Sequence, residues 1–132
     1  MKYFLHTDTC VDFLKGQSDD LRQAVENTAP TDIVITDIVA AELLTAAWLS
    51  SRRAKNQEQA QKLISHFQTV PFDRSCTQVY ADMYAKLSKK EHSLGDSDLL
   101  TAAIVLAQGG VLVTSRKDDF AVIKGLQLEK WS

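Results

Sequence analysis

The sequence predicts a single α/β domain over residues 1–132, with a central, mostly parallel sheet covered by helices on both faces. Three observations support this fold class. Short apolar or β-branched runs alternate along the chain with longer segments in which apolar residues have helical spacing. No repeat, low-complexity segment or linker divides the 132 residues, a length that suits one domain. The composition, 45% hydrophobic and 24% charged, is typical of a globular protein that builds its own core.

In the first half of the chain, each strand-like run is followed by helical segments. We expect strands at residues 3–5 and 33–36 and helices at residues 7–15, 19–27, 38–53 and 56–67. Thr7 or Asp8 can cap the first helix, and Gly16 ends it. Ser18 can cap the second helix, and Pro30 breaks the chain before the second strand. The third helix is rich in Ala and Leu, and the fourth has apolar residues at helical spacing.

The second half continues the alternation of strands and helices. We expect strands at residues 70–72, 111–114 and 126–131, the last at an edge of the sheet, and helices after residue 75, at 96–107 and at 118–123. Ser75 can cap the first of these helices. The second is strongly apolar, follows a polar loop at 89–95, and ends at Gly109.

Charge and cysteine content restrict the function classes. The net charge of −2 does not predict a surface coated with nucleic acid, although it leaves room for a local basic patch. Cys10 and Cys76 have no metal-binding spacing and are typical of buried free thiols in a reducing compartment. No signal peptide is recognised and no apolar stretch approaches the ~20 residues of a membrane span, so we expect a cytoplasmic protein with no membrane partner.

Acidic residues fall at the end of the predicted sheet where parallel α/β proteins bind their ligands, outside the carboxyl ends of the strands. These residues, together with one histidine, are His6, Asp8, Glu42, Asp96, Asp98, Asp118 and Asp119. His6 and Asp8 follow the first strand directly, and Glu42 lies in the first turns of the helix after the second strand. The remaining aspartates begin the helix at 96–107 or follow the strand at 111–114. We therefore expect these side chains to face one edge of the sheet.

Each of these acids also has a purely structural explanation. Glu42 lies in an otherwise apolar helix start, where a buried carboxylate is costly unless it is paired or bound to a metal. It could equally be a surface residue, or a favourable charge near the helix N-terminus. Asp96 and Asp98 are good capping residues, but two acids around Ser97 exceed what one cap requires. The aspartate pair at 118–119 could simply cap a short helix.

Several carboxylates held together repel one another, and a hard divalent cation relieves that repulsion. Mg²⁺ prefers oxygen ligands, and Mn²⁺ behaves similarly but also tolerates a nitrogen ligand. Such a cation suits phosphodiester hydrolysis, because it activates water and neutralises the charge that develops on the phosphate. The chain has no Walker loop, which argues against nucleoside triphosphate hydrolysis, and no Ser-His-Asp or Cys-His arrangement stands out.

Several short motifs contain these candidate residues or lie near them in the sequence. In chain order they are Leu5-His6-Thr7-Asp8, Ala41-Glu42-Leu43, Gly95-Asp96-Ser97-Asp98, Val113-Thr114, Phe120 and Gly125-Leu126. Over essentially the whole chain they resemble the motifs of the PIN-domain nucleases, and among them the VapC-type toxins of bacterial toxin–antitoxin pairs. Each motif alone is a weak signal, whereas their order and spacing together are specific.

The resemblance implies a PIN fold, endoribonuclease activity that depends on Mg²⁺ or Mn²⁺, and RNA as the substrate. It further implies a homodimer and neutralisation by a VapB-like antitoxin. By position, Glu42 and Asp98 correspond to metal-site acids, and Asp96 and Asp119 correspond to nearby catalytic helpers. The predicted function is therefore the toxin of a type II toxin–antitoxin pair.

The chain departs from the family pattern at two positions. His6 stands where the family's first metal-binding Asp is expected, and Arg116 stands where the family often has Asn or Asp. Asp118 or Asp119 could compensate for the second change. The first change removes a negative charge and should lower metal affinity substantially. Three alternatives remain open: His6 ligates Mn²⁺, Asp8 reaches the metal instead, or the site is weakened or disabled.

Two binding surfaces and two rival functions complete the prediction. Basic residues expected near the acidic end, and available to bind RNA, are Lys89, Lys90, His92, Arg116 and Lys117. The helices at 38–53 and 56–67 could offer an apolar groove to an antitoxin helix or form a dimer interface. One rival function is a catalytically inactive PIN domain that acts only by binding its antitoxin. The other, a receiver-like or flavodoxin-like signalling domain, is disfavoured because no acidic pair follows the first strand.

Overall fold

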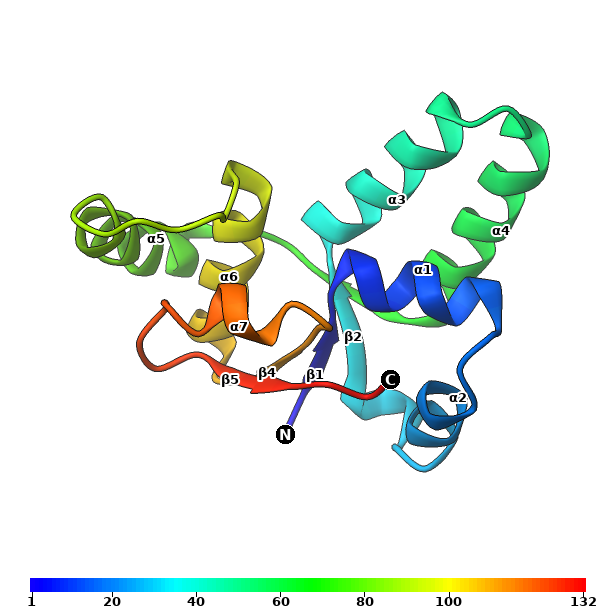
Figure 1. Cartoon of the computed structure of the whole chain (residues 1–132), viewed down its shortest axis with the longest axis horizontal. Helices are drawn as coiled ribbons and strands as arrows, with labels where there is room; N and C mark the ends of the chain where they lie inside the picture. Colours follow the sequence, from blue (N-terminus) through cyan, green and yellow to red (C-terminus); the bar gives the residue numbers. More distant parts are fainter.

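A five-stranded parallel sheet forms the centre of the computed structural model, which describes residues 1–132 (Figure 1). The strands are β1 (Tyr3–Leu5), β2 (Ile33–Thr36), β3 (Gln68–Val70), β4 (Val111–Val113) and β5 (Gln127–Glu129), in the order β3-β2-β1-β4-β5. The helices are α1 (Thr7–Lys15), α2 (Asp19–Glu26), α3 (Asp37–Leu49), α4 (Arg53–His66), α5 (Arg74–Leu87), α6 (Asp96–Gln108) and α7 (Lys117–Phe120), with a 3₁₀ turn at Pro30–Asp32. Every neighbouring pair of strands is parallel, which confirms the predicted α/β class.

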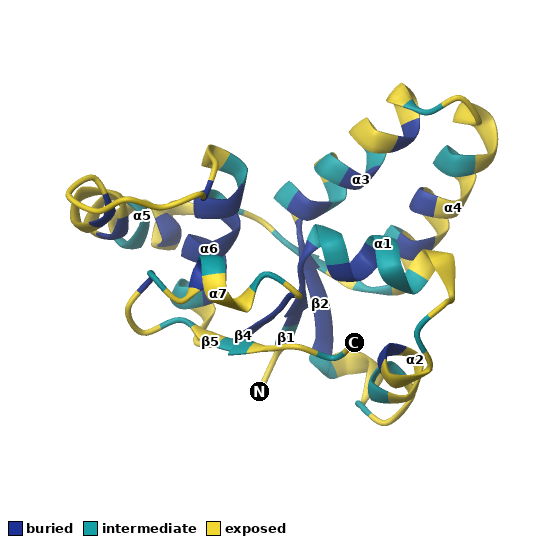
Figure 2. Cartoon of the chain, in the orientation of Figure 1, coloured by how far each residue is buried: buried dark blue, intermediate teal, exposed yellow.

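Helices cover both faces of this sheet because successive residues of a strand point to opposite sides. Phe4 of β1 and Leu112 of β4 belong to a core that they form with α5, α6 and α7. Leu5 of β1 and Val113 of β4 belong to a second core, formed with α1, α3 and α4. Figure 2 shows the resulting burial of the central strands. Burial on both faces explains why these strands read as continuous apolar runs rather than as alternating patterns.

The boundary between α3 and α4 differs from the predicted one. The helix predicted at 38–53 ends at Leu49, and α4 begins at Arg53 rather than at Asn56. The hydroxyl of Ser50 donates to the last turn of α3 at 2.7 Å and accepts from the Asn56 side chain at 2.9 Å. These two hydrogen bonds stabilise a tight turn where the Ala- and Leu-rich composition suggests a continuous helix.

Three shorter elements also deviate from prediction. β3 begins two residues before the predicted strand and ends before Pro71, which has no N–H to donate to a sheet. α7 covers 117–120 rather than 118–123. β5, at the edge of the sheet as predicted, covers 127–129 rather than 126–131.

Of three predicted helix caps, one is present, one is absent and one is replaced by a neighbouring residue. Ser18 accepts a hydrogen bond from the N–H of Leu21 at 3.2 Å, as predicted. α1 has no side-chain cap, because Asp8 lies within its first turn and extends its carboxylate toward the end of β4. α5 is capped by Asp73, whose Oδ1 accepts from the N–H of Ser75 at 2.9 Å. Ser75 itself is therefore inside the helix.

Candidate active site

The carboxyl ends of β1 and β4 bring two polar segments together at the centre of the sheet. Leu5 is aligned with Val113 across these strands, and the N–H of His6 donates to the Val113 carbonyl at 2.9 Å. The chain enters α1 directly after β1 and reaches α7 shortly after β4. Figure 1 shows that α1, α3 and α6 also begin at this end of the sheet. Residues from four segments of the sequence can therefore meet there: β1 with α1, the start of α3, the start of α6, and β4 with α7.

His6 lies between two carboxylates. Its Nδ1 is 3.4 Å from Asp8 Oδ1, and its Nε2 is 3.3 Å from Asp98 Oδ1. The residue is 3% exposed, neither imidazole nitrogen makes a well-aligned hydrogen bond, and the Phe120 ring packs edge-on at 5.1 Å between centroids. Burial works to lower the pKa of His6, but the two neighbouring carboxylates outweigh it and raise the pKa to about 9. The imidazole is therefore protonated at neutral pH.

Asp8 is fixed to the end of β4 by hydroxyl and amide donors. Its Oδ2 accepts hydrogen bonds from Thr114 Oγ1 at 2.9 Å, Ser115 Oγ at 2.7 Å and Ser115 N at 3.2 Å. Its Oδ1 accepts from the N–H of Thr9 at 2.6 Å. Burial favours the neutral acid, yet His6 and these donors hold the pKa of Asp8 well below its usual range. Asp8 is thus an ionised carboxylate with almost no free acceptor capacity.

Arg116 joins Asp98 to Asp119. Its Nη1 lies 3.2 and 3.3 Å from the two oxygens of Asp98, and its Nε donates to Asp119 Oδ2 at 3.1 Å. Asp98 also accepts the N–H of Gly95 at 3.2 Å, so it caps α6 as well as facing the site. Burial works to raise the pKa of Asp98, but His6, the Gly95 N–H and Arg116 together lower it.

These contacts form one connected group, which we call the ion-pair cluster. Its members are Asp8, His6, Asp98, Arg116 and Asp119, in which acidic and basic side chains alternate. The sequence left open whether Asp118 or Asp119 compensates for Arg116, and whether Arg116 binds a phosphate. Asp119 rather than Asp118 lies beside Arg116, and Arg116 binds carboxylates of its own chain rather than standing free for a phosphate.

Glu42 lies beside the ion-pair cluster rather than within it. Thr7 Oγ1 donates to its Oε1 at 2.8 Å, and Ser97 Oγ donates to its Oε2 at 3.1 Å. Because Ser97 immediately precedes Asp98, this second bond links α3 to the start of α6. Glu42 is only partly buried, and Asp96 is exposed. The structure therefore brings Glu42 to the edge of the site.

The sequence did not point to the hydroxyl groups that hold the acids. Thr7, Ser97, Thr114 and Ser115 each donate to Asp8 or Glu42. The only available signal was position, because Ser97 separates two aspartates and Thr114 follows a buried strand. Hydroxyl residues are common at both kinds of position for other reasons.

The residues at this site do not fit a divalent cation as they are arranged. No three His, Cys, Asp or Glu side chains converge in a way that could hold a metal ion. Arg116 lies against both oxygens of Asp98, and the unbonded imidazole nitrogens of His6 face Asp8 and Asp98. The open alternative in which Asp8 reaches a metal is disfavoured, because its oxygens already accept from Thr9, Thr114 and Ser115.

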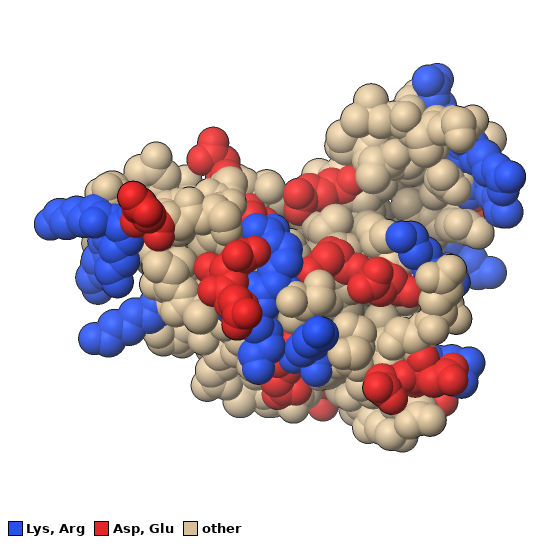
Figure 3. Space-filling model, in the orientation of Figure 1, with Lys and Arg blue, Asp and Glu red and all other residues tan.

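Basic side chains are distributed over more than one place. Figure 3 shows Lys and Arg atoms between acidic groups over the α7 region, and more at the α5 end of the molecule. Lys89 and Lys90, expected beside the acids, instead line a separate hollow of 460 Å³ with Lys86 and Lys124. His92 Nδ1 accepts a hydrogen bond from the backbone N–H of Leu94, so His92 has a local structural role.

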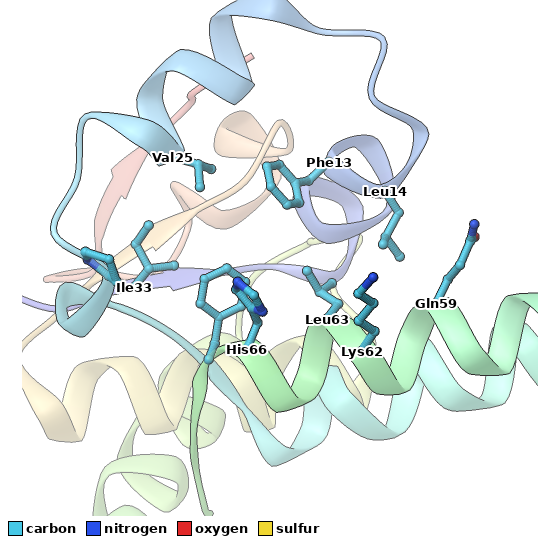
Figure 4. A pocket seen from close by; sticks show the side chains of 10 residues that line it. Phe13, Leu14, Val25, Ile33, Gln59, Lys62, Leu63 and His66 are labelled. Atoms are coloured by element: carbon cyan, nitrogen blue, oxygen red, sulfur yellow. The ribbon is translucent and has the colours of Figure 1, made fainter.

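A separate apolar groove lies between α1, α2 and α4. A hollow of 410 Å³ is lined by Phe13, Leu14, Val25, Leu63 and Phe67 among others (Figure 4). A second hollow of 310 Å³ shares Leu14 with the first and extends to α3. The groove was predicted between α3 and α4. Helices α1 and α4 line both hollows, whereas α2 lines only the first and α3 only the second.

A protein-family model and several known proteins match this chain. The PIN domain model matches residues 3–126. The chain is 31% identical to ribonuclease VapC2 of Rickettsia felis over 132 residues, covering 99% of this chain and 98% of that protein. It is 25% identical to the tRNA(fMet)-specific endonuclease VapC of Salmonella typhimurium, again covering 99% of this chain and 98% of that protein.

Solved structures resemble the chain over its full length. One is a crystal structure of VapBC2 from Rickettsia felis bound to a DNA fragment from their promoter, with a TM-score of 0.90, 30% identity and complete coverage of both chains. Another is DNA-bound VapBC from Salmonella typhimurium, with a TM-score of 0.93, 24% identity, and coverage of 100% of this chain and 99% of that one. At that identity the second structure supports the fold alone. No helix in the chain has both the length and the apolar character to span a membrane.

Proposed function

This chain belongs to the PIN-domain family, and from that premise we propose that it is the toxin of a type II toxin–antitoxin pair and hydrolyses RNA phosphodiester bonds. One observation carries the proposal. Acids that follow β1 and β4, namely Asp8 in α1 and Asp119 in α7, gather with acids in the first turns of α3 and α6 at the carboxyl edge of the sheet. This is the edge at which α/β folds bind ligands, and full-length relatives are named as ribonucleases.

In the proposed reaction, water attacks phosphorus and the bond from phosphorus to a ribose oxygen breaks. The attacking water loses a proton to a carboxylate, and the departing ribose oxygen gains one. Glu42 suits the first role, because its carboxylate is partly exposed and is oriented by the hydroxyls of Thr7 and Ser97. Asp98 lies next to Ser97 at the start of α6 and would position the reacting groups. Asp96 and Asp119 are proposed as helpers at the rim of the site.

The proposed partner is a VapB-like antitoxin. The solved relatives are described as VapBC complexes, two of them with DNA. The apolar groove between α1, α2 and α4 suits an apolar helix or extended segment of such a partner, because Phe13, Leu14 and Leu63 line it. A homodimer, expected from the family resemblance, stays a prediction.

A second candidate function is an inactive PIN domain that acts only by binding its antitoxin. The contacts of His6 and Arg116 with Asp98 specifically favour it, because they engage the acid that a nuclease would use. The Mg²⁺ or Mn²⁺ requirement expected from the resemblance also stays a prediction, since the ion-pair cluster does not fit that cation as arranged.

Cleavage of labelled RNA by the purified chain tests the proposal. The samples are the unmodified chain, Asp98→Ala, and Asp20→Ala as a control for loss of an exposed carboxylate on α2. We expect the chain and the Asp20 variant to cut RNA in Mg²⁺ or Mn²⁺ and the Asp98 variant not to. Equal cleavage by the Asp98 variant would refute the site. Absence of cleavage in all three, with normal antitoxin binding, would establish the inactive alternative.

A further inference from the structure

The ion-pair cluster contains its own positive charges. It contains three carboxylates: one basic side chain separates Asp8 from Asp98, and a second separates Asp98 from Asp119. Like charges at such separations repel strongly, so an acidic centre of this kind needs a counter-ion. Here the guanidinium of Arg116 lies between Asp98 and Asp119, and the imidazole of His6 lies between Asp8 and Asp98.

The acceptor positions of Asp98 are already used. Both of its oxygens face Arg116 Nη1, at 3.2 and 3.3 Å. One of them is also 3.3 Å from His6 Nε2, and the other accepts the N–H of Gly95 at 3.2 Å. A divalent cation needs several oxygen atoms of this kind and would have to replace the guanidinium to reach them.

We propose that Arg116, with His6 beside it, is the built-in counter-ion of this acidic centre and takes the place that a divalent cation would otherwise fill. The inference deepens the proposed function, and it rests on that function only in treating these acids as the active-site acids. It also explains together the two departures inferred from the family resemblance: His6 and Arg116 stand where that resemblance implies acidic or amide residues, and both contact Asp98.

The two basic residues differ in how they could leave the site. The side chain of Arg116 is 34% exposed and precedes the first turn of α7, so it can turn outward into solvent. The side chain of His6 is 4% exposed and packs against Phe120, so it cannot move without unpacking the core. Arg116 is therefore the residue that controls access to Asp98 and Asp119, and His6 sets the charge of the deeper part of the site.

Replacing these residues should convert the centre into one that binds metal. Arg116→Asn removes a positive charge and releases oxygens of Asp98 and Asp119. His6→Asp adds a carboxylate next to Asp8 and Asp98. Because each change makes the centre more negative, we expect each to tighten Mn²⁺ and Mg²⁺ binding roughly tenfold or more, and the double variant most. A single exposed ion pair elsewhere should not have this effect.

Metal binding can be measured without any RNA. Titration calorimetry and the metal-induced shift of the melting temperature are compared for the unmodified chain, Arg116→Asn, His6→Asp and the double variant. Arg22→Asn is the matched control, because Arg22 pairs with Asp19 on the surface of α2. Arg116→Lys is a milder variant, which keeps the charge but cannot bridge two carboxylates in the same way.

We expect weak binding by the unmodified chain, Arg22→Asn and Arg116→Lys, and markedly tighter binding by Arg116→Asn, His6→Asp and the double variant. Equal affinity of the unmodified chain and Arg116→Asn would overturn the inference. Should His6→Asp fail to fold, the comparison of Arg116→Asn with Arg116→Lys and Arg22→Asn decides it alone. RNA cleavage is not part of this readout. A chain that cuts no RNA could still show the expected pattern of metal affinities, and a chain that cuts RNA could fail to show it.

Discussion

Protonation of the buried His6 should make the stability of the metal-free protein depend on pH. The pKa of this imidazole is raised from 6.5 to about 9 in the fold by Asp8 and Asp98, against the effect of burial. A raised pKa means that folding favours the charged form, so the stabilisation is complete below the unfolded pKa of 6.5. It is lost as pH rises through about 9. At about 1.4 kcal/mol per pKa unit, the full effect is on the order of 3 kcal/mol.

Urea unfolding between about pH 6 and about pH 9 in the presence of EDTA measures this effect. His6→Asn is the comparison, because it removes the titrating group while keeping a polar side chain of similar reach. The free energy of unfolding of the unmodified chain should fall across this interval, whereas that of His6→Asn should stay much flatter. Burial also raises the pKa of the Cys10 thiol, to about 12, but this contribution is common to both proteins and cancels. Parallel curves would refute the assignment of a protonated His6.

Three further substitutions test the fold and the proposed partner surface. Gly110→Ala should destabilise the protein by about 1–3 kcal/mol in urea unfolding, because a Cβ atom there would lie 2.6 Å from the Phe4 ring; an unchanged midpoint would contradict this close packing. Phe120→Ala should cost about 3–5 kcal/mol, since the ring is fully buried beneath the ion-pair cluster; a loss below about 1 kcal/mol would contradict that packing. Leu14→Glu should weaken antitoxin binding about tenfold or more in a pull-down or calorimetric titration, without changing RNA cleavage. Leu49→Glu is the control and should leave antitoxin binding unchanged, because Leu49 is exposed and lies outside the groove. Equal binding by both variants would refute the groove.

Much of the fold was predictable because its signals are local. The apolar runs around Phe4 and Val34 are buried on both sides of the sheet, and such runs are recognisable without tertiary information. Ser18 caps α2 through a bond to a residue only three positions away. The break after Leu49 was not predictable, because it depends on a contact between Ser50 and Asn56 that exists only once both helices have turned.

The site was predictable in its location but not in its internal contacts. The rule for parallel sheets placed Asp98 and His6 at one edge of the sheet, and in the structure Asp98 Oδ1 lies 3.3 Å from His6 Nε2. The contact of Arg116 with Asp98 spans 18 residues and depends on where α7 begins. In the same way, the local sequence around Asp8 predicts a helix cap, but its carboxylate accepts a hydrogen bond from Thr114, 106 residues away at the end of β4. Long-range pairing of this kind leaves no local pattern in one sequence.

The central claim is that these acids form a ribonuclease centre that is balanced by the chain's own basic side chains. The most direct measurement is the rate of RNA cleavage by the His6→Asp, Arg116→Asn double variant relative to the unmodified chain at low Mn²⁺ concentration. We expect faster cleavage by the double variant, and loss of that cleavage when Asp98→Ala is added. Equal rates for the double variant and the unmodified chain, or undiminished cleavage by the triple variant, would contradict it.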